Sequence, residues 1–275
     1  MFDCTIVIPL FNNVEYTYAC LARLAEVTPD ELYEVVLVDN GSTDATSELL
    51  EQLEGDVTII RNEQNVGFSH ACNQGAAAAR GRSLLFLNND TVPHDGWLEP
   101  LLAALDEPGV GIVGAKLLFP NGTIQHGGVL VIDDPTLPLP LLPVHLFHET
   151  AGDTAEANMR RDLTAVTGAC MLVRRELFET CNGFDEEYWN GFEDIDLCLR
   201  VGELGWRIVY EPASTLMHHE SVSGPERFAK QEQNLARLNS QWRDRLLPEA
   251  VRCDDGQLRR RSATAAFPRA VLPID

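Results

Sequence analysis

Lysine is nearly absent from this sequence: only Lys116 and Lys230 occur in 275 residues, and the formal net charge is -21. Proteins that bind nucleic acid neutralise its phosphates with clustered lysine and arginine, so this charge balance argues against a nucleic-acid partner. An anionic substrate would have to be held by local devices rather than by a basic surface. The preference for arginine over lysine has two equal explanations, a high-salt cytoplasm or GC-rich coding.

Long apolar runs and paired cysteines are also missing. A membrane helix needs about 20 apolar residues, and no stretch approaches that length. The first residues include an acid, Asp3, where a signal peptide carries basic residues. The seven cysteines form no CxxC pair, which argues against a zinc knuckle or a disulfide framework. We therefore expect buried thiols in a reducing compartment and a cytoplasmic protein.

Strand, turn and helix patterns alternate through the first ninety residues. Short runs rich in branched apolar residues predict buried strands at Thr5–Pro9, Val35–Val38, Val57–Arg61 and Leu84–Leu87, with helices between them. This order predicts right-handed βαβ crossovers and an α/β fold with a mostly parallel central sheet.

The second half is regular in most places. The patterns predict strands at Val129–Ile132, Cys170–Val173, Arg207–Tyr210 and Thr215–Met217, and helices at Gly96–Leu105, Arg175–Cys181, Asp194–Leu204 and Pro225–Leu247. The pair Asn121-Gly122 predicts a hairpin turn.

Three stretches of this half need separate interpretation. Gly109, Gly111 and Gly114 satisfy GxGxxG, but they follow a helix and precede a strand, the reverse of the dinucleotide-binding context. The segment Asp133–Asp153 holds four prolines and little periodicity, which indicates a long loop and, as a hypothesis, an acceptor-side lid. Residues 248–275 read as a peripheral or flexible tail.

The stretch Ser83–Asp90, SLLFLNND, carries the strongest functional signal. Its apolar strand stops abruptly in Asn88, Asn89 and Asp90. Ligands of open α/β sheets bind at the carboxyl ends of the strands, where these three side chains would emerge. One carboxylate flanked by amides predicts a site for a metal-bound, phosphate-containing substrate.

Two polar stretches follow other strands of the expected sheet. In VDNGSTD, Asp39 ends a strand, where its carboxylate could accept the imide N–H of uracil or thymine. Turn chemistry alone explains the same residues and is the preferred interpretation of this motif by itself. Asn65 and Gly67 open a helix whose free N–H groups could serve a phosphate or a base.

The acids of GFEDIDLCLR fall at the start of a predicted helix. Capping and the helix dipole explain acids there, and Asp196 can pair with Arg200 four residues on. Capping does not require two adjacent acids, so Glu193 and Asp194 remain candidates for a general base. His218 ends a later strand beside these acidic motifs and is a candidate metal ligand.

Taken together, these stretches resemble the inverting glycosyltransferases of family 2, which have a GT-A fold. The resemblance runs nearly continuously from Thr5 to about Ser223, and the combination of NVGF, LNND and GFDE is most similar to rhamnosyltransferase-like members. It implies a Rossmann-like three-layer sandwich, with a nucleotide-binding half at 1–120, an acceptor and catalytic half at 121–224, and a C-terminal helix at 225–247.

The resemblance also implies roles for individual residues. Asp194 would be the catalytic base with Glu193 beside it, Thr167 and Gly168 would border the sugar, and Asp90 and His218 would hold the metal. The nucleotide would be bound by Pro9, Asn12, Asp39, Asn65, Gly67, Asn88 and Asn89.

One position departs from the family's pattern. Asn88 replaces the first carboxylate of the DxD motif, and an amide oxygen is a neutral, weaker ligand. We therefore expect modest affinity for Mg²⁺ or Mn²⁺, which would bind mainly together with the nucleotide, and His218 would favour Mn²⁺.

The sequence thus predicts a metal-dependent transferase. It would move rhamnose or a hexose from a dTDP- or UDP-sugar to a glycan or lipid-linked acceptor in the synthesis of cell-surface polysaccharide or glycoprotein. A non-catalytic nucleotide-sugar-binding or scaffold protein and a nucleotidyltransferase are the alternatives. A lipid-linked acceptor would allow peripheral contact with the inner face of the membrane, and Arg259–Arg261 could touch anionic head groups, although a solvated tail is the preferred interpretation of that cluster.

Overall fold

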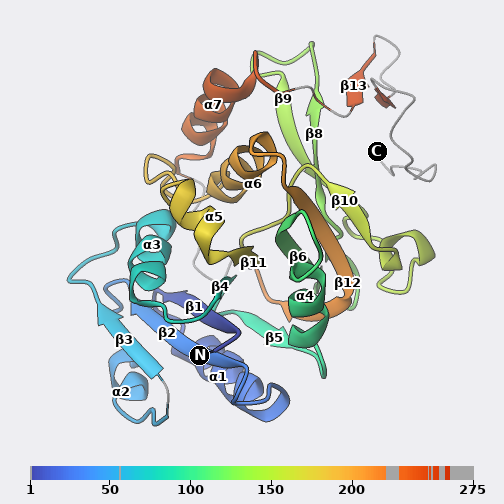
Figure 1. Ribbon diagram of the computed structural model, residues 1–275. Helices are drawn as coiled ribbons and strands as arrows, with labels where there is room; N and C mark the ends of the chain where they lie inside the picture. Colours follow the sequence, from blue (N-terminus) through green and yellow to red (C-terminus); the bar gives the residue numbers. More distant parts are fainter. Residues whose placement is uncertain are drawn as a thin grey trace.

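A computed structural model of the chain describes residues 2–55, 57–220, 229–246, 248, 250–253 and, as backbone only, 258–260. Within these ranges ten strands form the main sheet, with the order β10-β12-β6-β11-β4-β1-β2-β3 along its path, while β5 pairs with β12 and β7 with β6. A second sheet has the order β14-β13-β8-β9. Figure 1 shows both sheets.

The strands are β1 Cys4–Leu10, β2 Tyr33–Asp39, β3 Val57–Arg61, β4 Ser83–Leu87, β5 Thr91–Pro93, β6 Val110–Leu118, β7 Ile124–His126, β8 Val129–Asp133, β9 Leu141–His145, β10 Arg161–Leu163, β11 Cys170–Arg174, β12 Arg207–His218, β13 Ala250–Arg252 and β14 Leu258–Arg260. The helices are α1 Val14–Val27, α2 Thr46–Leu50, α3 Phe68–Ala78, α4 Leu98–Leu105, α5 Arg175–Thr180, α6 Glu193–Glu203 and α7 Gln231–Trp242, with a 3₁₀ turn at Ala155–Asn158.

The main sheet is buried on both faces, as its apolar strands predict. In β1, Ile6 and Ile8 pack into one core with side chains of α1, α2 and α4, whereas Val7 packs into the other with α3, α5 and α6. Successive side chains of a strand point to opposite faces, so an uninterrupted apolar strand supplies both cores. The expected three-layer α/β architecture is confirmed (Figure 1).

The strand β11 joins the two halves of the main sheet. It lies antiparallel between β4 and β6, and Cys170, its first residue, pairs with Leu87, the last residue of β4. Because β11 runs in the opposite direction, the residues that precede it lie beside those that follow β4. This reversal brings 167–169 to the edge that carries Asn88.

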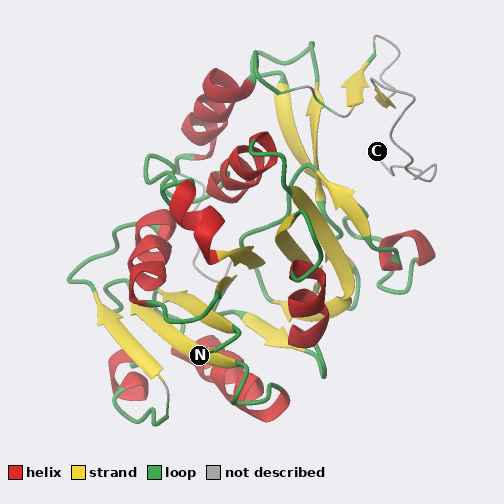
Figure 2. Cartoon of the chain, viewed as in Figure 1, coloured by secondary structure: helices red, strands yellow, loops and turns green. Residues whose placement is uncertain are grey.

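The second sheet corrects two expectations. The proline-rich segment is not one long loop, because β9 pairs with β8 along five residue pairs and Asn239 of α7 exchanges two hydrogen bonds with the backbone of Leu141. Prolines are tolerated here because β9 is an edge strand. Part of the segment is therefore a strand (Figure 2), and its role as an acceptor-side lid stays a prediction.

The expected tail also begins in this sheet. β13 pairs in parallel with β8, and Arg252 lies 2.6 Å from Asp134. Residues 250–252 are consequently a sheet strand rather than an irregular tail. Arg261 of the basic cluster lies outside the described residues.

Other boundaries differ locally. The two strands expected around Pro212 are one strand, β12, whose pairing with β6 shifts register between Glu211 and Thr215. The Asn121-Gly122 hairpin is confirmed by the antiparallel pairing of β6 and β7. The expected start of the last helix, and the last residues of the family resemblance, lie within 221–228, outside the described residues.

The cysteines behave largely as expected. Five of the seven are buried, while Cys181 and Cys253 are half-buried, and all seven are free thiols. In the part of the chain that the structure describes, no helix combines the length and apolarity that a membrane crossing requires.

Candidate active site at the carboxyl edge of the main sheet

The loop after β2 forms the first wall of the site. Asp39 is buried, and its carboxylate accepts the backbone N–H of Ser42 over 2.9 Å. Asn12, which follows β1, accepts the N–H of Thr43 through its side chain over 2.7 Å. Its own backbone N–H donates to Ser42 Oγ. The two strand-end loops are therefore fastened together, with Pro9 half-buried in β1 beside them.

Asn40 organises the second wall, although its sequence context indicated only turn chemistry. Its amide nitrogen donates to Asn65 Oδ1 over 3.0 Å and to the carbonyl of Gly67. Its amide oxygen accepts from the side chain of Asn62 and from the N–H of Val66. One buried amide thus shapes the loop that opens α3, and this long-range role has no local sequence signal.

Gly67 is a required glycine at the start of α3. Its φ of +91° is unfavourable for other residues, and an added Cβ would lie 2.9 Å from the carbonyl oxygen of Trp189. The next residue, Phe68, donates its N–H to that same carbonyl over 3.0 Å. The expected nucleotide loop therefore packs directly on the loop that precedes α6.

The end of β4 meets the end of β12. Asp90 Oδ1 lies 3.0 Å from His218 Nε2, and both side chains are about 6–7% exposed. The N–H of His219 donates to the carbonyl of Asp90, and the Asn88 side-chain nitrogen lies 3.3 Å from His218 Nε2. The structure thus brings together the two expected metal ligands and the amide that replaces a carboxylate.

Asn89 points elsewhere. Its side chain donates to Thr17 Oγ1 on α1 over 2.9 Å. In this geometry the amide joins the loop after β4 to α1. The assignment of Asn89 to the nucleotide site stays a prediction.

The residues before β11 support the expected base. The N–H of Asn88 donates to the carbonyl of Ala169, and the N–H of Gly168 donates to Asp194 Oδ2 over 2.8 Å. Asp194 Oδ1 accepts the N–H of Ile195 over 2.8 Å. Asp194 is half-buried, and the segment Gly168–Ala169 joins it by hydrogen bonds to Asn88, which follows β4.

The environments of the two adjacent acids differ. Burial raises the pKa of Asp194, and the hydrogen bonds from Gly168 and Ile195 oppose that rise. Glu193 is 4% exposed and its Oε2 has no hydrogen-bond partner among the described residues. Burial first, and then the negative charge of Asp194, raise the pKa of Glu193 to about 8. Of the two acids, Asp194 is the one that is partly exposed and can be reached by an acceptor.

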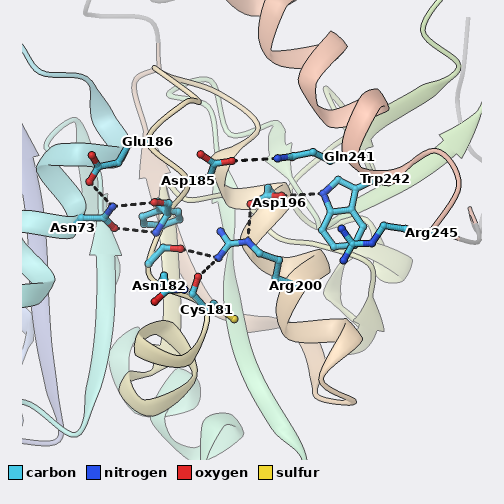
Figure 3. Close-up of a pocket in the computed structure, with 12 residues that line it drawn as sticks. Asn73, Cys181, Asn182, Asp185, Glu186, Asp196, Arg200, Gln241, Trp242 and Arg245 are labelled. Carbon is cyan, nitrogen blue, oxygen red and sulfur yellow. Dashed lines mark hydrogen bonds and ion pairs between the residues drawn. The ribbon is translucent and has the colours of Figure 1, made fainter.

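Asp196 has the structural role that its spacing predicts. It accepts from Arg200 over 2.7 Å and from Trp242 Nε1 of α7 over 2.9 Å. Both bonds border a cavity of about 460 Å³ between α6, α7 and the loop 181–186 (Figure 3). No residue expected in the nucleotide, sugar or metal site lines this cavity. Asn73 also lines it and bonds Phe184 and Glu186, which makes it a loop anchor.

Sequence comparison assigns the chain to a family. The profile described as "Glycosyl transferase family 2" matches residues 5–181, and one described as "N-terminal domain of galactosyltransferase" matches residues 152–220. The chain belongs to glycosyltransferase family 2. This membership sets aside the nucleotidyltransferase alternative, and the suspected resemblance is confirmed.

Individual family relatives cover most of the chain. It is 36% identical over 228 residues to the O-antigen biosynthesis protein RfbC of Myxococcus xanthus, a match that covers 80% of the chain and 17% of RfbC. It is 28% identical over 225 residues to the N-acetylglucosaminyl-diphospho-decaprenol L-rhamnosyltransferase of Mycobacterium tuberculosis, covering 74% of the chain and 71% of that enzyme.

The chain spans only a small part of some curated family 2 relatives: 17% of RfbC, and 27% of an uncharacterised protein of Sinorhizobium fredii. Among solved structures it is similar to the mannosyltransferase PcManGT of Pyrobaculum calidifontis, in complex with GDP-Man and Mn²⁺, with a TM-score of 0.65 and 18% identity over 90% of this chain and 65% of that one. This similarity confirms the GT-A fold of the family 2 domain.

Proposed function

We propose that this family 2 domain is an inverting transferase that moves rhamnose or a hexose from a nucleoside diphosphate donor to a glycan or lipid-linked acceptor. One observation carries the proposal. The N–H of Gly168 orients the carboxylate of Asp194 at the same sheet edge as the Asp90–His218 pair. The hydrogen bond from Asn88 to the carbonyl of Ala169 links the two places. A base and a diphosphate site are what inversion requires side by side.

Asp194 would act as the general base. Inversion needs one group that removes the proton of the acceptor hydroxyl as that oxygen attacks the anomeric carbon, opposite the leaving diphosphate. Burial raises the pKa of Asp194, which strengthens it as a base, while two backbone N–H donors favour its ionised form and orient it. No covalent nucleophile is needed. Glu193, buried and disposed to stay protonated, would not compete for the acceptor proton.

Asp90 and His218 fit a divalent cation. Their facing atoms are 3.0 Å apart, the separation of two ligands at right angles on an octahedral ion with bonds of about 2.1 Å. In the described residues no group of three or more His, Cys, Asp or Glu side chains could hold a metal. Two protein ligands agree with a cation that binds together with the diphosphate, and the imidazole nitrogen favours Mn²⁺. When bound, the cation would neutralise charge on the leaving group.

The nucleoside would lie against the loops of Asp39, Asn12 and Asn65. Among the described residues the carboxylate of Asp39 accepts one backbone hydrogen bond, through Oδ1, so its second oxygen would take the imide N–H of uracil or thymine. The name of the mycobacterial relative supports rhamnose, and that of RfbC supports polysaccharide synthesis. Because PcManGT was solved with GDP-Man, guanine is the third base to test beside uracil and thymine. A cytoplasmic location with peripheral membrane contact would suit a lipid-linked acceptor.

A thermal-shift panel tests the donor site. UDP, dTDP and GDP, and their sugars, are each added with and without Mn²⁺, and selective stabilisation by UDP or dTDP with Mn²⁺ is expected. Transfer and donor hydrolysis are then measured for the stabilising sugar. Binding without any turnover would favour the non-catalytic scaffold alternative, and full activity of Asp194→Asn at saturating donor would remove Asp194 from the mechanism.

A further inference from the structure

A chain of three side chains leads from the candidate metal site into the protein. His218 Nδ1 lies 2.5 Å from Gln125 Oε1, and Gln125 Nε2 donates to Glu220 Oε2 over 3.2 Å. Gln125 and His218 are about 5–6% exposed, so bulk water does not compete for the bond between them, while Glu220 is half-buried. Gln125 belongs to the short strand β7, the second strand of the hairpin that Asn121-Gly122 predicts.

When Nε2 of His218 ligates a cation, the hydrogen bonds of these three side chains have one consistent arrangement. An ionised carboxylate only accepts hydrogen bonds, so Glu220 requires the amide nitrogen of Gln125 to face it. The amide oxygen must then face His218, and an oxygen acceptor at 2.5 Å requires a proton on Nδ1. A ring with its proton on Nδ1 keeps the lone pair of Nε2, on the side of Asp90, available to a cation held between them.

The backbone of Gln125 is held firmly enough to fix this arrangement. Its carbonyl lies 3.1 Å from His148 Nδ1. The neighbouring Ile124 donates to the carbonyl of Thr150 and accepts from the N–H of Glu149, both over 2.7 Å. On the other side, β7 pairs with β6. The amide of Gln125 is thus presented from a backbone that is bonded on both edges.

We infer that Gln125 is a positioning residue for metal binding: oriented by Glu220, it selects the tautomer of His218 whose Nε2 can ligate the cation of the donor complex. The inference rests on the proposed function for the existence of that cation. A ligating histidine depends on the partner of its other ring nitrogen, and loss of such a partner typically weakens metal binding about 10- to 100-fold.

The test compares variants of the full chain by their affinity for Mn²⁺. Gln125→Met keeps the side-chain length and removes the acceptor, and Gln52→Met makes the same change at an exposed position, where the side chain bonds only a backbone carbonyl of its own helix region. The double variant Gln125→Glu/Glu220→Gln exchanges the two groups, so that an acceptor still faces His218 and a donor–acceptor pair remains behind it. Free Mn²⁺ is titrated by EPR with UDP or dTDP present.

We expect Gln125→Met to weaken Mn²⁺ binding at least about 10-fold, Gln52→Met to leave it unchanged, and the double variant to restore most of it. Nitrogen-15 spectra of histidine-labelled wild type with Mg²⁺ and nucleotide should show the proton of His218 on Nδ1. Wild-type affinity in folded Gln125→Met, or a proton on Nε2 in the wild type, would overturn the inference.

The outcomes also separate this inference from the proposed function. If the wild type binds Mn²⁺ with nucleotide and Gln125→Met weakens it, yet no sugar is ever transferred, the transferase proposal fails and the role of Gln125 stands. If sugar is transferred equally well in EDTA and no Mn²⁺ binds, the transferase stands and the role of Gln125 is refuted.

Discussion

The N–H of Gly168 donates a hydrogen bond to Asp194 Oδ2 over 2.8 Å, so a backbone group of one segment orients the candidate base of another. An added Cβ at Gly168 would lie 3.3 Å from Asp194 Cβ, which shows how closely the two segments pack. The orientation of the carboxylate is therefore set by backbone geometry.

Replacing this carboxylate should affect chemistry more than binding. Asp194→Asn preserves the shape of the side chain and one of its two acceptor oxygens, which can face Gly168, but removes the base, so we expect kcat to fall about 10²- to 10⁴-fold with little change in donor KM. Steady-state transfer assays measure both constants. Asp95→Asn, at an exposed ion pair with Arg23, is the matched control and should behave as the wild type.

Metal removal should abolish transfer, and the effect of added Mn²⁺ should depend on Asp90. Treatment with EDTA is expected to stop transfer, and Mn²⁺ should restore it better than Mg²⁺ because His218 supplies a nitrogen ligand. In Asp90→Ala the thermal shift caused by Mn²⁺ plus nucleotide should disappear. Activity that survives exhaustive chelation would contradict a metal-dependent step.

The glycine that opens α3 offers a test of the nucleotide loop. Gly67→Ala places a Cβ 2.9 Å from the carbonyl oxygen of Trp189 at a φ of +91°, so we expect loss of stability and weaker nucleotide binding. Gly55→Ala has a similar φ of +97° with open space around its Cβ position, and it isolates the backbone cost. Calorimetric titration with the nucleotide should separate the two variants; equal affinities would argue that the loop does not form the donor site.

The bond between α6 and α7 should matter for stability. Trp242→Phe removes the donor to Asp196 Oδ1 and leaves a buried carboxylate oxygen without that partner, at a cost of about 1–3 kcal/mol in the free energy of unfolding. Denaturant unfolding measures this change. The folded fraction should keep its transfer activity, because the bond lies beside a cavity that none of the expected nucleotide, sugar or metal-site residues lines. A selective loss of kcat with unchanged stability would contradict the structural role.

Glu193 predicts a pH dependence of stability. Its pKa is raised in the folded protein to about 8, from an ordinary value of 4.5, so between these values the folded state holds a proton that the unfolded state has released. The free energy of unfolding therefore falls, through this group, as pH rises from about 4.5 to about 8. Glu193→Gln, which is neutral throughout, should gain stability relative to the wild type between pH 5 and pH 8.5. Parallel pH profiles of the two proteins would show that Glu193 ionises normally.

Much of the fold follows from local patterns. Uninterrupted apolar strands such as Ser83–Leu87 can be buried only between two layers, and their alternation with helices determines the parallel half of the sheet. The polar residues at the strand ends likewise indicated one functional edge, because parallel strands end together. Asp196 and Arg200 pair as their helical spacing predicts.

The sequence by itself determined the layered fold, the family and the residues that end the strands, because each depends on neighbours within a few positions. Only the tertiary structure decided which distant strands pair: β9 and β13 became strands through pairing with β8. The same long-range contacts gave Asn40 and Gln125 their roles. An amide side chain has no periodicity of its own, and its function depends on the partner that the folded chain brings to it.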